Sequence, residues 1–130
     1  MSEFAEKLKY RTKQFAIDII QFTQTFPKSD EAFIIKKQLL RSSFSVAANY
    51  RAVCRARSDG EFFSKLSIVV EEADEVLFWI ELLTESKIIK VEESKKYSNE
   101  AKEILSIVAK SRKTLREKNQ IDINKNSTIQ

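Results

Sequence analysis

Apolar residues recur along most of this chain at alternating spacings of four and three, which is the pattern of a helix that buries one face. The clearest run consists of Phe62, Leu66, Val69, Ala73, Val76, Ile80 and Leu83. Three further runs share this spacing, and together the four runs predict helices over residues 4–26, 31–56, 59–85 and 91–118. Residues 119–130 lack the period and are expected to form a disordered tail.

The breaks between these runs carry residues that end and begin helices. Pro27 cannot continue the first helix. The segment from Ser58 to Glu61 is a capping box, in which the Ser58 hydroxyl accepts from the Glu61 backbone N–H and the Glu61 carboxylate accepts from the Ser58 N–H. Short connections make consecutive helices antiparallel neighbours. The predicted fold is therefore all-α, an up-down-up-down left-handed four-helix bundle over residues 1–118.

The composition supports this fold class and excludes several kinds of chemistry. The chain of 130 residues has one Gly and one Pro, against average usage of roughly 7% and 5%, so few turns are expected. It has no His, which removes the commonest general base and metal ligand. Its single Cys rules out an internal disulfide and a multi-cysteine zinc site. We expect no enzymatic activity, no cofactor and no metal.

The N-terminal region and the hydropathy of the chain bear on its location. Charged Glu3, Lys7 and Lys9 follow Met1 without an apolar segment, so no signal peptide is expected. No run of about 18 apolar residues is present, so neither a transmembrane helix nor a membrane partner is expected. A lone thiol suits a reducing compartment. These features predict a cytoplasmic protein.

Two charged stripes are visible on the predicted second and third helices. The basic stripe of the second helix consists of Lys37, Arg41, Arg51 and Arg55. The acidic stripe of the third helix consists of Glu71, Asp74, Glu75, Glu81 and Glu85, with Ile68 and Phe78 among them. One interpretation is a solvated surface. The other is a contact in which the basic stripe of one subunit meets the acidic stripe of the next. Candidate residues for that contact are Lys37, Arg41, Arg51, Ile68, Glu71, Glu75, Phe78 and Trp79.

Another interpretation of the carboxylates on the third helix is a metal site or a catalytic site. Di-metal bundles use Glu-x-x-His pairs on facing helices, and this chain has no His. Asn49 lies on an apolar stripe of the second helix, where a polar residue at a bundle seam fixes the helix register. Cys54 is expected to be a small core residue. These polar residues therefore predict structure rather than catalysis.

Positive charge is expected to gather at one end of the bundle. The net charge is +4. In an up-down-up-down bundle, the start of the first helix and the ends of the second and fourth helices lie at the same pole. The cations there are Lys7, Lys9, Arg11, Arg55, Arg57, Lys110, Arg112, Lys113 and Arg116. Such a cluster predicts phosphate contacts with RNA or DNA, although scattered solubilising charge is the alternative interpretation. No sequence-reading motif is present.

Two segments, QLLRSSFSVAANYR at 38–51 and the stretch 55–83, resemble the four-helix-bundle proteins encoded in intervening sequences of bacterial 23S ribosomal RNA genes. The matching positions are Arg41, Ser45, Val46 and Asn49, followed by Ser58, Glu61 and Phe62. The resemblance extends over about residues 4–118. It departs at Ala52, where many members of the family have Glu.

The resemblance implies a bundle that assembles into a ring, a homopentamer in known members, without established enzymatic activity. A distant relative, the accessory protein of diversity-generating retroelements, is basic and binds nucleic acid and a reverse transcriptase. We therefore expect a non-catalytic accessory or scaffold protein that binds RNA through a basic pole as a homo-oligomer. The alternative is a protein–protein adaptor that does not bind nucleic acid.

Overall fold

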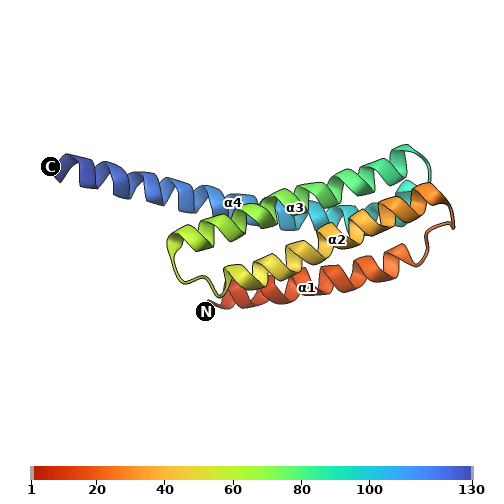
Figure 1. The fold of residues 1–130 in the computed structure, drawn as a ribbon, viewed down its shortest axis with the longest axis horizontal. Helices are drawn as coiled ribbons and strands as arrows, with labels where there is room; N and C mark the ends of the chain where they lie inside the picture. Colours follow the sequence, from red (N-terminus) through yellow and green to blue (C-terminus); the bar gives the residue numbers. More distant parts are fainter. Residues whose placement is uncertain (1, 130) are drawn as a thin grey trace.

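The computed structural model describes the backbone of residues 2–129 and the side chains of residues 2–125. It contains four helices, α1 (Glu3–Thr23), α2 (Asp30–Val53), α3 (Asp59–Glu85) and α4 (Val91–Ile129), and no strand among the described residues. Successive helices run antiparallel through short connections (Figure 1). The all-α class and the four-helix arrangement are confirmed, whereas the left-handed sense stays a prediction.

The first three helices begin at a serine whose side chain caps the first turn. Ser2, Ser29 and Ser58 have extended backbones, and each hydroxyl accepts from the N–H three residues later, at 3.1, 3.2 and 3.0 Å respectively. Such a cap satisfies one of the N–H groups that a helix leaves without a partner. The capping box is only half formed, because the Glu61 carboxylate accepts from the N–H of Arg57 at 3.4 Å instead of from Ser58.

The last helix differs from its expected length. We expected a disordered tail at 119–130, but α4 continues to Ile129, and Gln130 lies outside the described residues. No Gly or Pro follows residue 60, so nothing in the sequence breaks the helix, and each added residue gains one backbone hydrogen bond. Gln120 also donates to Asn124 Oδ1 at 3.3 Å, one turn ahead. As a result, α4 projects past the end of the bundle (Figure 1).

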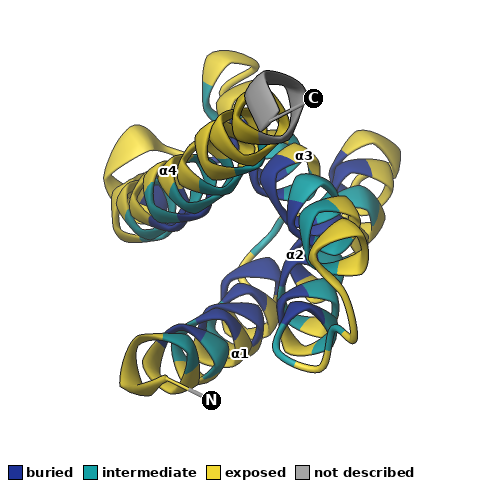
Figure 2. Ribbon diagram, turned by 90° about the vertical axis from the view of Figure 1, so that its left-hand side faces the viewer, coloured by how far each residue is buried: buried dark blue, intermediate teal, exposed yellow. Residues whose placement is uncertain are grey.

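The core is built from the apolar stripes that the spacing predicted. Buried residues lie on the sides of the four helices that face one another (Figure 2). They include Leu8, Phe15, Ile19, Phe22, Ile35, Leu39, Val46, Val53, Leu66, Val69, Ala73, Val76, Ile80, Leu83, Ala101, Ile104 and Val108. Thr12, Ser42 and Ser43 are buried too, and their hydroxyls donate to carbonyls of their own helices. No buried polar side-chain atom in the described region lacks a partner.

The four helices are not equally close. α2 and α3 pack most tightly, whereas α1 and α4 are the least closely packed neighbours (Figure 2). The side-chain interactions between these two helices include an arginine–carboxylate cluster and an aromatic stack. Arg11 donates to both carboxylate oxygens of Glu100, at 2.8 and 2.6 Å, and lies 3.0 Å from Glu103. The Phe22 ring stacks on Tyr97 with centroids 4.3 Å apart. These contacts hold α1 against α4.

Candidate nucleic-acid interface

The two chain segments rich in cations, together with the start of α1, lie at one end of the bundle. The N-terminus, the α2–α3 connection and the C-terminal part of α4 are on the same side in Figure 1. The arrangement follows from the antiparallel order of the helices. We expected nine cations at this end. The structure separates them into a group that pairs with carboxylates and a group that does not.

The α1 cations are neutralised by acids. Lys7 lies 3.1 Å from Glu3, and Lys9 lies 3.4 Å from Glu6. Arg11 is held by two carboxylates of α4, and its hydrogen bonds with Glu100 raise the pKa of its guanidinium above the usual value. Arg11 therefore joins two helices, and the α1 cations add little positive potential to this end.

The cations of the α2–α3 connection and of α4 are different, because no carboxylate forms an ion pair with them in the described region. They are Arg55, Arg57, Lys110, Arg112, Lys113 and Arg116, which we call the basic pole. Arg112 is half-buried and the other five are exposed. The Arg116 guanidinium lies 5.7 Å from the centroid of the Phe63 ring, so α4 also contacts the start of α3 here. Six uncompensated cations can bind phosphate groups.

A pocket opens within this end of the bundle, and all four helices or their termini contribute to it. Its volume is about 300 Å³. The lining residues are Ser2, Phe4, Ala5, Tyr50, Val53, Cys54, Ala56, Phe62, Leu66 and Ser111. We call it the pole pocket. Burial raises the pKa of Tyr50 to about 12 and raises the pKa of the Cys54 thiol. The pocket is therefore uncharged near neutral pH and has apolar and aromatic walls.

The charged stripes of α2 and α3 partly pair within one chain. Arg41 reaches the Glu72 carboxylate at 3.2 Å and also pairs with Glu75. Trp79 donates from Nε1 to Glu75 at 3.2 Å. The Arg41 guanidinium lowers the pKa of Glu75, whereas burial raises the pKa of Glu72. Arg41, Glu75 and the Trp79 N–H therefore already have partners within one chain, and their part in a contact between subunits stays a prediction.

The rest of the α3 stripe has no partner in the described region. Of the acidic stripe, Glu71, Asp74, Glu81 and Glu85 form no ion pair there, and their side chains and that of Phe78 are exposed. Phe78 is 52% exposed and contacts Trp79 edge-on at 4.9 Å. Ile68 is half-buried, and Lys37 lies over the Phe33 ring at 5.5 Å on α2. An exposed phenylalanine among acids is an apolar feature that a purely solvated face does not favour.

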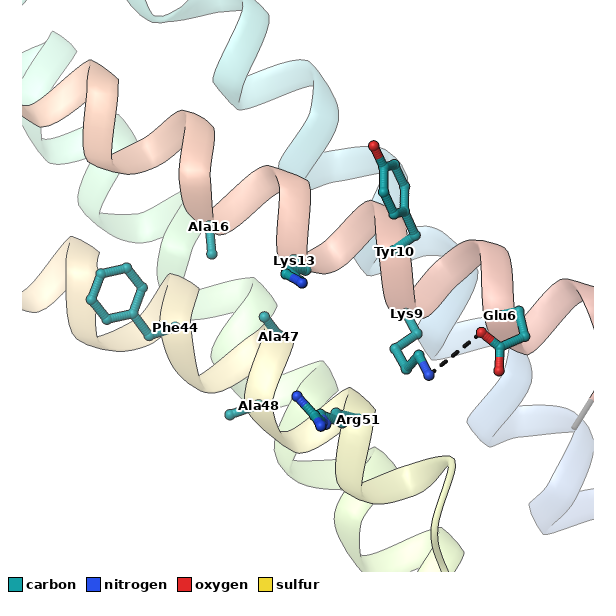
Figure 3. Close-up of a pocket in the computed structure, with 9 residues that line it drawn as sticks. All are labelled: Glu6, Lys9, Tyr10, Lys13, Ala16, Phe44, Ala47, Ala48 and Arg51. Carbon is teal, nitrogen blue, oxygen red and sulfur yellow. Dashed lines mark ion pairs between the residues drawn. The ribbon is translucent and has the colours of Figure 1, made fainter.

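A groove of about 560 Å³ runs between α1 and α2 on the outside of the bundle. Its lining residues are Glu6, Lys9, Tyr10, Lys13, Ala16, Phe44, Ala47, Ala48 and Arg51 (Figure 3). The three alanines have short side chains and leave the base of the groove open, and Phe44 lies at one end. Lys13 extends toward the groove from α1 and Arg51 from α2. The basic stripe residue Arg51 therefore belongs to this α1–α2 groove.

A family model described as 23S rRNA-intervening sequence protein matches residues 7–110. The chain belongs to this family. No curated protein matches the chain. It is similar to a solved protein of unknown function from the S23 ribosomal protein family of Bacteroides thetaiotaomicron. The two are 30% identical with a TM-score of 0.77, over 84% of this chain and 97% of the other.

In this member of the 23S rRNA-intervening sequence protein family, the signature residues have structural roles. Arg41 joins α2 to α3, and Ser58 caps α3. Asn49 donates to the carbonyl and the hydroxyl of Ser45, at 3.0 and 2.9 Å. Both bonds stay within α2 and Asn49 is half-buried, so its position at a helix seam stays a prediction. The described side chains form no group of three or more potential metal ligands, and no described helix could span a membrane.

Sequence reasoning missed the pole pocket and the α1–α2 groove. Phe4 lies off the apolar stripes, whereas Phe44 lies on a second apolar stripe of α2 with Phe33, Leu40, Ala47 and Cys54, and both rings are exposed. A usable signal was present in each case. Ala47 and Ala48 are small residues on the outer side of α2, next to Phe44, and Phe4 is the second residue of α1, two positions after its cap Ser2.

Proposed function

We propose that this chain is a non-catalytic, cytoplasmic accessory protein that binds RNA through its basic pole and acts as a homo-oligomer. The observation that carries the proposal is the separation of paired and unpaired cations. Lys7, Lys9 and Arg11 of α1 are compensated, while the cations of the α2–α3 connection and of α4 at the same end form no ion pair in the described region. Unpaired surface cations gathered at one pole attract a polyanion. Membership in a family linked by description to 23S rRNA intervening sequences is consistent with this role.

Salt dependence and a triple substitution test the proposal. We expect Lys110/Arg112/Lys113→Ala to weaken binding of a labelled single-stranded RNA, measured by fluorescence anisotropy. Each lost phosphate contact lowers the slope of log affinity against log salt by about 0.7 for a single strand, so the slope should fall by about two.

The matched control removes the same charge at the other end of the bundle. Lys28, Lys90 and Lys95 are exposed and lie near the α1–α2 and α3–α4 connections. The variant Lys28/Lys90/Lys95→Ala should keep the wild-type slope. An equal loss in both triple variants would point to net charge alone and overturn the assignment to the pole. No binding by the wild-type protein would favour the adaptor function.

Self-association is the second part of the proposal. The acidic stripe of one copy complements the α1–α2 groove of another, because Phe78 can enter over the alanine floor while its acids meet Lys13 and Arg51. Each copy carries both surfaces on different faces, so the contact is heterologous and repeats head to tail. Such contacts close into rings, which fits the homopentamer that the family resemblance implies.

We expect Phe78→Asp to shift the mass measured by light scattering toward the monomer, since it replaces the ring that enters the groove with a charged side chain. Ala48→Glu should do the same from the groove side, because it fills the floor and adds a charge. Phe4→Asp is the matched control, since Phe4 has similar exposure but lies at the pole. Unchanged mass in both stripe and groove variants would exclude this contact.

A further inference from the structure

The pole pocket lies where the basic pole would bring the RNA backbone, although its own lining is uncharged. Arg55 is placed in the chain between the lining residues Cys54 and Ala56, and Lys110 and Arg112 flank the lining residue Ser111. Arg55 and Lys110 are exposed. Unpaired cations of the α2–α3 connection and of α4 are therefore sequence neighbours of residues that line the pocket.

The walls of the pocket suit a flat aromatic group. Phe4 is 56% exposed at the mouth, and half-buried Phe62 comes from the start of α3. Tyr50 is only 5% exposed and lines the interior with Cys54. The hydroxyls of Ser2 and Ser111 supply polar edges. At about 300 Å³ the pocket is at the lower end of small-ligand sites, which is room for one ring system.

We propose that the pole pocket receives one unpaired nucleobase of a single-stranded RNA, while Arg55 and Lys110 hold the flanking phosphates. The inference rests on the proposed function, and it deepens that function by specifying single-stranded over duplex RNA. Proteins bind single strands by stacking splayed bases on aromatic side chains beside a cationic path, and a base inside a duplex cannot enter such a pocket. The pocket supplies the aromatic walls, and the basic pole supplies the cations.

The test compares a labelled single strand of twelve or so mixed nucleotides with the same strand annealed to its complement. We expect Phe4→Ala to weaken single-strand binding roughly fivefold or more, because each base–aromatic stack contributes that much, and to leave duplex binding unchanged. Phe33→Ala is the control, since Phe33 is equally exposed but lies at the start of α2, at the opposite end. Ala56→Phe, which fills the pocket without removing a charge, should reproduce the effect of Phe4→Ala.

Cys54 offers an independent readout, because it lines the pocket and is the chain's one thiol. Single-stranded RNA should slow alkylation of Cys54 by a maleimide, and duplex RNA should not. If the wild-type protein binds no RNA, the proposed function and this inference both fail. If binding depends on the Lys110/Arg112/Lys113 cluster but Phe4→Ala, Ala56→Phe and Cys54 protection show nothing, the inference alone is overturned. Equal losses in Phe4→Ala and Phe33→Ala overturn it as well.

Discussion

Replacing Phe22 with alanine is expected to destabilise the bundle by about 3–5 kcal/mol, which is the usual range for removing a fully buried phenylalanine. Phe22 is 2% exposed, stacks on Tyr97 at 4.3 Å and meets Phe26 edge-on at 4.9 Å. The substitution therefore leaves a cavity and also removes the aromatic contact between α1 and α4. Because a domain of this size is stable by only about 5–15 kcal/mol, much of the stability would be lost.

Urea denaturation at a fixed protein concentration measures this effect, since oligomerisation links stability to concentration. Phe22→Leu keeps most of the volume and should cost less than about 1.5 kcal/mol. Phe4→Ala is the surface control and should change the free energy of unfolding by no more than about 0.5 kcal/mol. If Phe22→Ala were as mild as Phe4→Ala, α1 would not be packed against α4 through this ring.

The two arginines that join helices should differ in their contributions to stability. Arg11→Ala is expected to cost about 1.5–3 kcal/mol, the range for hydrogen bonds to charged groups. Its side chain is 33% exposed, it binds Glu100 through two hydrogen bonds, and its loss leaves Glu100 and Glu103 adjacent without a counter-charge. Arg41→Ala should cost about 1 kcal/mol or less, because Arg41 is 48% exposed and solvent screens its pairs with Glu72 and Glu75.

Thermal or urea unfolding of both arginine variants checks this order. The double variant Arg11→Ala/Glu100→Ala should be less destabilised than Arg11→Ala, because removing the Glu100 carboxylate also removes its repulsion with Glu103. A loss of equal size in Arg11→Ala and Arg41→Ala would mean that the α1–α4 pair contributes no more than a surface ion pair. Because Arg41 pairs within its own chain, Arg41→Ala should also leave the mass unchanged.

The fold was largely predictable from sequence because burial is periodic. The spacing of Leu66 and Ile80 from the neighbouring apolar residues predicts that both side chains face the core, and both are buried in the structure. The positions of helix ends were predictable where a side chain caps the backbone, as at Ser58. The end of α4 was not, since loss of the apolar period marks where packing stops, and a helix can continue beyond that point.

The candidate site was only partly predictable, because the spacing of residues along one helix does not show which ion pairs they form with another helix. Arg11 and Arg55 looked alike as basic residues near one pole. Only the fold shows that Arg11 meets Glu100 across α1 and α4, whereas Arg55 forms no ion pair in the described region. Arg41 is a similar case, since its pairing with Glu72 depends on how α2 lies against α3.

The uneven closeness of the helices has a consequence for how the chain acquires its structure. α2 and α3 are the tightest pair and are joined by a short, capped connection, so their contacts require little loop closure and should form early. α1 leaves the ribosome first, yet its contacts with α4 involve residues such as Glu100 that are synthesised last. The nascent chain would therefore expose the apolar face of α1 until α2 and α3 have formed a surface to receive it, and α4 would be the last of the four helices to pack.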